Sequence, residues 1–204
     1  IPLPVTALLV PVLAYFFKIL SPVAAMAPFS NTIIFLFMGG FTLAALLNKH
    51  GIDLWLAERV IRLAQGSLWL SVVGFYAITS ILSMFISNTA TTAMMVPIAV
   101  SLIDKKFPRM RTMLILGTAY AANIGGNGTV VGSPPNGIAA AALNLSFIDW
   151  FKIGFPTMLL MFPLVVIALW YVIKPESDAY VNRLDSGNFI WTPLAKGTIV
   201  LFLF

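Results

Sequence analysis

The chain has 204 residues, of which 60% are hydrophobic and only 9% charged, whereas ordinary soluble domains carry about 25% charged residues. This composition excludes a soluble globular protein and predicts an integral membrane protein. The chain holds no Cys, which excludes disulfides and thiolate metal sites. The net charge of +5 fits basic cytoplasmic loops and gives no reason to expect a nucleic-acid partner.

Long apolar stretches rich in Leu, Ala, Met and Phe predict an all-α fold, because the alternating pattern of β-strands is absent. Because the chain starts at Ile1 without an initiator Met and stops inside an apolar run, we expect it to be part of a longer protein. The predicted spans, in chain order, are 4–20, 31–48, 67–86, 90–103, 110–124 continued by 136–144, 153–173, and the start of another at 190–204.

The segment 51–65 differs from these spans, because apolar residues alternate there with Asp53, Glu58, Arg59 and Arg62. This pattern predicts a short amphipathic helix. The helix lies either at the cytoplasmic membrane interface or packed against its neighbours.

Basic residues assign the two sides of the membrane, because cytoplasmic loops are enriched in Lys and Arg. One basic cluster precedes the segment 67–103 and another follows it, so this segment enters from the cytoplasm and returns to it. The clusters are Lys49, His50, Arg59 and Arg62, then Lys105, Lys106, Arg109 and Arg111. We expect a re-entrant helical hairpin, although two full spans joined by a polar loop at the far surface would also fit.

The remaining connections follow from this orientation. The loop 144–150 is predicted outside, and the span 153–173 returns to the cytoplasm. A polar cytoplasmic linker follows, with Lys174, Glu176, Asp178, Arg183 and Asp185.

Two polar clusters interrupt the apolar chain, one at Ser87–Thr92 and the other at residues 125–136. Polar groups at membrane depth are costly unless they face protein, water or a ligand, so the clusters predict a solute or ion site. Ser83 and Ser87 are four residues apart, which predicts that they share a helix face. The alternative is that these hydroxyls bond back to the carbonyl four residues earlier.

The predicted spans contain no carboxylate, which disfavours a proton relay, and His50 lies in a loop. Neutral hydroxyl, amide and carbonyl oxygens are instead suited to an alkali cation. Helix starts capped by Ser87, Asn88 or Thr89, and by Ser133 before Pro134, would offer N–H groups to an anion. No His is placed to act as a base, so an enzyme is not expected.

At these residues the chain resembles the divalent anion:sodium symporter family of sodium-coupled di- and tricarboxylate carriers. The resemblance rests on the tripeptide Ser87-Asn88-Thr89, the stretch from Ile124-Gly125-Gly126 to Ser133-Pro134-Pro135-Asn136, the run Ile33–Gly40, and the early residues Pro2–Leu9. These features occur in the family's order along nearly the whole chain.

The resemblance implies a set of binding residues. Sodium would be held by Ser83, Ser87 and Asn88 together with backbone carbonyls of Gly125, Gly126 and Gly128. The anion would contact Asn88 and Thr89 at the hairpin tip. We add Thr129 and Ser133 as candidates from the second polar cluster.

The resemblance also implies two inverted repeats, a homodimer, and a transport domain that moves against a scaffold like an elevator. Residues 1–66 would be scaffold-type helices with the interfacial helix. Residues 67–144 would be half of the transport domain, with the hairpin 67–103 and a broken helix 110–144. Residues 145–204 would be the return span, the linker and the start of the next span.

The predicted function is sodium-coupled symport of small dicarboxylates, of the succinate or malate class, across the inner cell membrane. Alternatives are a sodium-independent dicarboxylate exchanger and a carrier of citrate or sulfate. Two rivals of another class also remain open: an ion channel lined by the same clusters, and a structural membrane subunit.

Overall fold

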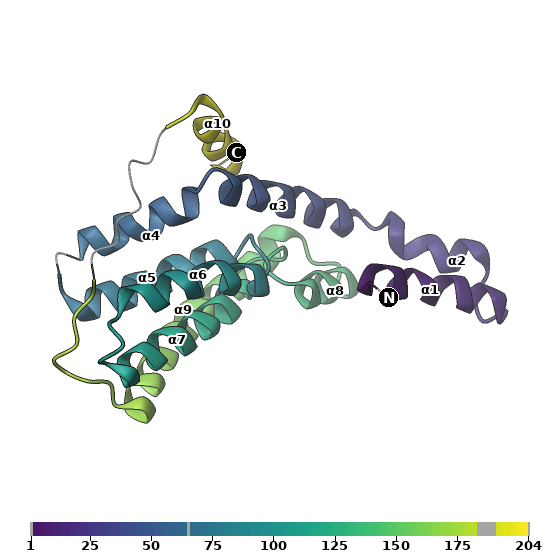
Figure 1. The fold of residues 1–204 in the computed structure, drawn as a ribbon. Helices are drawn as coiled ribbons and strands as arrows, with labels where there is room; N and C mark the ends of the chain where they lie inside the picture. The colour runs from purple at the N-terminus through teal and green to yellow at the C-terminus, as the bar shows by residue number, and fades with distance from the viewer. Residues whose placement is uncertain (1, 65, 183–190, 204) are drawn as a thin grey trace. The chain divides into compact units, whose positions relative to one another are not determined.

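The computed structural model describes residues 2–64, 66–182 and 191–203, which are helical with short connections (Figure 1). Among these residues the β-type pairing is an isolated bridge between Ile103 and Val181, which confirms the all-α class. The chain divides into two compact units, Ile1–Gly39 and Gly40–Phe204.

The first unit holds α1 (Leu3–Phe16), α2 (Pro22–Met26), the 3₁₀ helix η1 (Ala27–Ser30) and the start of α3 (Thr32–Lys49). The predicted span 4–20 is too long, because α1 ends at Phe16 and Lys18 has a positive φ of 57°. Many large apolar side chains here are exposed, as is expected of helices that face lipid.

The second unit begins with the end of α3, which turns into α4 (Ile52–Leu63) through Gly51 at a φ of +65°. α4 packs against α5 and buries Ala57, Glu58 and Ile61, and the Glu58 carboxylate pairs with Arg62 at 2.8 Å. This packing favours the second interpretation of the segment 51–65, a helix held by its neighbours. Helix α10 (Pro193–Leu203) contributes Ala195 to a small cluster with Leu47 and Ile52.

The centre of the second unit is α7 (Pro108–Gly126), which packs against α5 (Leu68–Ser83), α6 (Asn88–Leu102) and α9 (Phe147–Ile173) (Figure 1). The Tyr76 hydroxyl of α5 donates a hydrogen bond to the Met113 carbonyl of α7 at 2.7 Å. Gly117 leaves room for the Tyr76 ring, because a Cβ there would lie 2.1 Å from it. Buried apolar side chains complete the core, including Phe75, Met95, Met110 and Leu114.

The predicted broken helix is present as α7, the connection 127–133 and α8 (Pro134–Ala142). The predicted external loop 144–150 is wrong in extent, because α9 already begins at Phe147. Ser146 and Asp149 form a capping box there, in which each side chain accepts the other's backbone N–H.

Two helical stretches among the described residues are long and apolar enough to cross a membrane, Pro22–Lys49 and Phe147–Ile173. Helices α5 and α6 have only 16 and 15 residues. Residues 174–182 after α9 form no helix, and the predicted linker residues Arg183 and Asp185 lie outside the described residues.

Segment 176–182 of this linker contacts the adjoining ends of α6 and α7. The Glu176 carboxylate accepts hydrogen bonds from the backbone N–H groups of Arg109 at 3.1 Å and Met110 at 2.7 Å. Asn182 donates to the carbonyls of Leu102 and Ser101 at the end of α6. Residues distant in sequence therefore satisfy these helix termini.

Candidate functional site

The turn between α5 and α6 separates the two serines that the sequence placed on one helix face. Ser83 is the last residue of α5, whereas Ser87 is the N-cap of α6 and its hydroxyl accepts the Ala90 N–H at 3.3 Å. The shared-face expectation is therefore wrong, because the helix ends between them. The expected capping role of Ser87 is confirmed.

Asn88, the first residue of α6, connects three parts of the second unit. Its side-chain oxygen accepts a hydrogen bond from the Ser83 hydroxyl at 3.0 Å, and its amide nitrogen donates to the Asn123 side chain of α7 at 3.2 Å. The same side chain lies directly against Gly126, where a Cβ would stand 2.1 Å from the Asn88 oxygen. The start of α6 is thus tied to the end of α5 and the end of α7.

The glycines at the end of α7 allow other parts of the chain to approach its backbone closely. A Cβ on Gly125 would lie 2.2 Å from the Ser80 carbonyl oxygen, so the backbones of α5 and α7 touch there. The Ser80 hydroxyl strengthens the contact by donating to the Ala121 carbonyl at 2.9 Å. Ser80, which is buried and lies one turn before Ser83, was not among the predicted site residues.

Hydrogen bonds of two buried side chains, Thr129 and Asn136, hold the connection 127–133 in place. The buried Thr129 hydroxyl donates to the Met84 carbonyl in the hairpin turn and accepts the Gly132 N–H at 3.1 Å. The Asn136 amide donates to the carbonyls of Gly126 at 2.7 Å and Thr129 at 2.8 Å. These bonds fix the second polar cluster against the hairpin turn.

Trp150 also supports this connection, since its indole N–H donates to the Asn127 carbonyl at 3.1 Å. The sequence placed Trp150 in a loop, so this support was not foreseen.

The remaining candidates differ in exposure. Thr89 is exposed on the first turn of α6. Ser133 is the N-cap of α8, but its side chain makes no capping bond, contrary to our expectation. Gly128 is buried against the Met84 side chain, and its N–H donates to the Gly125 carbonyl at 2.9 Å.

The chemistry of this cluster is neutral. The described residues contain no group of three or more His, Asp or Glu side chains that could hold a metal ion. The oxygens that keep a lone pair beyond their present bond are the Ser83 hydroxyl, the Asn88 amide oxygen and the Gly126 carbonyl. The Gly125 carbonyl already accepts the N–H groups of Asn127 and Gly128. Such oxygens suit Na⁺ rather than a transition metal.

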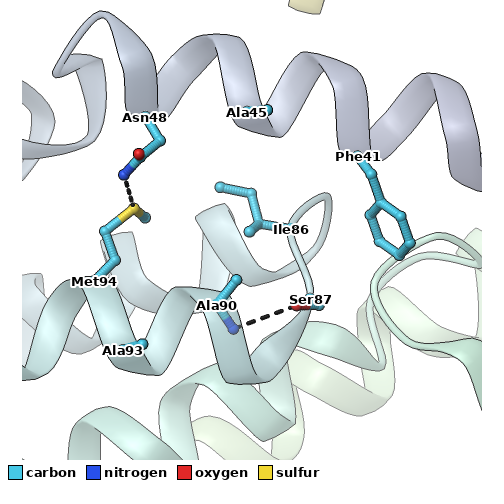
Figure 2. Close-up of a pocket in the computed structure, with 8 residues that line it drawn as sticks. All are labelled: Phe41, Ala45, Asn48, Ile86, Ser87, Ala90, Ala93 and Met94. Atoms are coloured by element: carbon cyan, nitrogen blue, oxygen red, sulfur yellow. Dashed lines mark hydrogen bonds between the residues drawn. The ribbon is translucent and has the colours of Figure 1, made fainter. Parts of the chain in front are cut away.

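A cavity of about 660 Å³ borders the other side of the hairpin turn (Figure 2). At one end the Asn48 amide of α3 contacts the Met94 sulfur of α6 at 2.7 Å. Ser87 is the one predicted site residue in the cavity wall, which is otherwise formed by Phe41, Ala45, Ile86, Ala90 and Ala93. This mostly apolar wall is unsuited to a small dianion.

Comparison with known proteins agrees with a transport function. The citrate transporter family model matches residues 1–203. The chain is 43% identical over 202 residues to an uncharacterized transporter of Haemophilus influenzae, covering 97% of this chain and 44% of that protein. It is 34% identical over 190 residues to the sodium-dependent dicarboxylate transporter SdcS of Staphylococcus saprophyticus, covering 84% of this chain and 37% of that protein.

The chain thus spans less than half the length of these relatives. The family match extends over nearly the full length of the chain. The chain belongs to the citrate transporter family, and the names of the family and of these relatives are those of transporters and not of enzymes.

Proposed function

We propose that the full-length protein containing this chain is a sodium-coupled symporter of small dicarboxylates of the succinate or malate class. The observation that carries the proposal is the Asn88 side chain, which joins Ser83 at 3.0 Å and Asn123 at 3.2 Å and packs on Gly126. A single amide at the hairpin tip thereby links three helix ends. We expect a ligand bound at one of these ends to alter the contacts at the other two.

Na⁺ fits this set of oxygen ligands, because the oxygens are neutral and lie where helices are interrupted. Ser83, Ser87, Asn88 and the carbonyls of Gly125, Gly126 and Gly128 would hold it. A bound Na⁺ supplies positive charge beside a site that has no Lys or Arg. The relative named a sodium-dependent dicarboxylate transporter supports the same assignment.

The dicarboxylate would bind beside the starts of α6 and α8, where helix N-termini favour negative charge. Thr89 is exposed at the first of these starts and Ser133 lies at the second. Asn88 would contact both the ion and the anion. Thr129 would position the connection 127–133, because its hydroxyl is already bonded to Met84 and Gly132.

Helix length supports a re-entrant hairpin. With 16 and 15 residues, α5 and α6 rise about 24 and 22 Å, short of the roughly 30 Å hydrocarbon layer. The tip at Ser87–Thr89 would then lie at depth. We propose that the hairpin and the α7–α8 break move together as half of an elevator-type transport domain in a homodimer. An inverted second repeat would supply the other half of the site.

A citrate carrier is the second candidate, because the matching family is described as citrate transporters. Citrate carries one carboxyl group more than succinate, and the described half of the site does not distinguish them. Competition of citrate with labelled succinate in transport assays would separate the two substrates.

The decisive experiment is succinate uptake into proteoliposomes by the full-length protein, with and without an inward Na⁺ gradient. We expect Na⁺-dependent uptake that falls at least about tenfold in Asn88→Ala, because a lost hydrogen bond to a charged ligand costs about 1.5–3 kcal/mol. Asn144→Gly is the control, since Asn144 is exposed and has a φ of 51° that Gly tolerates.

Other outcomes assign other functions. Uptake that needs internal dicarboxylate but no Na⁺ would indicate an exchanger. Flux that does not saturate would indicate a channel. Loss of assembly in Asn88→Ala, with no ligand response in the wild type, would indicate a structural subunit.

A further inference from the structure

A buried hydroxyl beside the proposed ion site lacks a hydrogen bond. Thr91 of α6 has 0% exposure, and its Oγ1 has no partner. Within the part of the chain that the structure describes, the same holds for the Ser71 hydroxyl and the Arg111 Nε. A buried polar group without a partner costs about 1–3 kcal/mol, so a hydroxyl at this position needs an explanation.

Other threonines in these helices show the usual solution, in which the hydroxyl donates to the carbonyl four residues earlier. This bond is present for Thr6, Thr79, Thr112, Thr118, Thr157 and Thr198. The corresponding carbonyl for Thr91 belongs to Ser87 and accepts the Thr91 backbone N–H at 2.9 Å. The Thr91 hydroxyl makes no such bond.

The position of Thr91 on the helix directs its side chain toward the site. It lies three residues after Asn88, on the same face of α6, and helical side chains lean toward the helix N-terminus. The rest of the buried face is apolar, formed by Met95, Ile98, Ala99 and Leu102. The hydroxyl therefore replaces an apolar group only in the layer next to Asn88.

We propose that the Thr91 hydroxyl is a further oxygen ligand of the sodium site, completed when the ion binds. The inference rests on the proposed function, since it adds one residue to the same site. It explains the presence of Thr at a position where an isosteric Val would remove an unpaired buried hydroxyl. The hydroxyl supplies a neutral oxygen of the same kind as Ser83.

The test is a Na⁺ titration of thermal unfolding of the full-length protein, with choline replacing Na⁺ to hold ionic strength constant. Thr91→Val is expected to unfold at the wild-type temperature or higher without Na⁺. Its half-saturating Na⁺ concentration should rise about tenfold, corresponding to about 1.4 kcal/mol. Thr91→Ser keeps the hydroxyl and should titrate like the wild type.

Ser71→Ala is the matched control, because it removes the other unpaired buried hydroxyl. Ser71 lies 12 residues before Ser83 on α5, about 18 Å along the helix. We expect Ser71→Ala to leave the Na⁺ titration unchanged. If Thr91→Val does not accumulate, Thr91→Ala and Thr91→Ser provide the same comparison, since they differ only in the hydroxyl.

An unchanged Na⁺ titration in Thr91→Val, when the wild type responds to Na⁺, would overturn this inference and leave the proposed function intact. Equal weakening in Thr91→Ser or Ser71→Ala would also overturn it, because packing would then be the cause. A wild type that Na⁺ does not stabilise would overturn the proposed function and this inference together.

Discussion

The two ends of the α6–α7 pair are held in different ways. Where α6 starts and α7 ends, neutral side chains and glycine contacts join the helices, with Asn88 between Ser83 and Asn123. Where α6 ends and α7 starts, Glu176 and Asn182 of the linker satisfy the helix termini. The first end keeps unused oxygen lone pairs, whereas the second has a carboxylate bonded to two N–H groups.

We therefore expect the first end to affect Na⁺ binding and the second end to affect the stability of the folded protein. The neutral cluster at the first end has oxygens with spare lone pairs, which would accept a cation under the proposed function. The linker contacts join residues more than 60 positions apart and close the second unit regardless of any ligand. Substitutions at the two ends should therefore affect different measurements.

The largest expected effect is at the first end. In Gly126→Ala, the added Cβ would stand 2.1 Å from the Asn88 side-chain oxygen, so Asn88 must turn away. We expect the protein to fold and Na⁺-dependent uptake to fall at least about tenfold, or 1.4 kcal/mol. Proteoliposome uptake and a Na⁺ titration of unfolding would measure this.

Gly39→Ala is the control for this substitution, because a Cβ there meets nothing within 4 Å. It should leave uptake unchanged. Normal Na⁺ affinity in Gly126→Ala would show that the contact between Asn88 and Gly126 has no part in binding.

A substitution at the second end should lower the stability of the protein and leave its Na⁺ affinity unchanged. Glu176→Gln leaves one acceptor oxygen in place of two, so one N–H at the start of α7 loses its partner. We expect a loss of about 1 kcal/mol, as for other helix N-caps, with the Na⁺ affinity unchanged. Thermal unfolding with and without Na⁺ measures both, and Asp178→Asn serves as an exposed acidic control. A changed Na⁺ affinity would contradict the separation of the two ends.

The smallest effect is the pH dependence of the same contact. Burial raises the pKa of Glu176, but the N–H groups of Met110 and Arg109 and the charge of Arg109 outweigh it, so the net pKa is below 4.5. A lowered folded pKa gives stability that is complete above pH 4.5 and lost as the pH falls through the folded value. The difference in unfolding temperature between wild type and Glu176→Gln should therefore shrink below pH 4.5. A difference that persists there would show that the carboxylate charge is irrelevant.

Much of the secondary structure was predictable, because apolar runs and helix-cap residues are local signals. The two helices on either side of Ser87, the interruption between α7 and α8, and the cap at Ser87 were predicted near their observed positions. The re-entrant character of the helix pair stays a prediction. The errors lie at boundaries, such as the early start of α9 at Phe147. The capping box of Ser146 and Asp149 starts α9 inside the predicted loop.

The candidate site was predictable in composition and only partly in arrangement. The tripeptide at Ser87–Thr89 and the glycines after Ile124 indicated the candidate residues, and in the structure Asn88 lies against Gly126. The prediction that Ser83 and Ser87 share a helix face was wrong, because the helix ends between them. The internal bonds of Thr129 depend on a carbonyl 45 residues away, which no local pattern indicates.

The membrane class, the helices and the neutral chemistry of the polar clusters could be predicted from the sequence, because composition and periodicity are properties of neighbouring residues. The contact of Asn88 with Gly126, the capping of α7 by Glu176 and the unpaired Thr91 hydroxyl could be seen only in the folded chain. These contacts require particular helix ends to lie side by side. Packing between segments that are distant in the sequence brings those ends together.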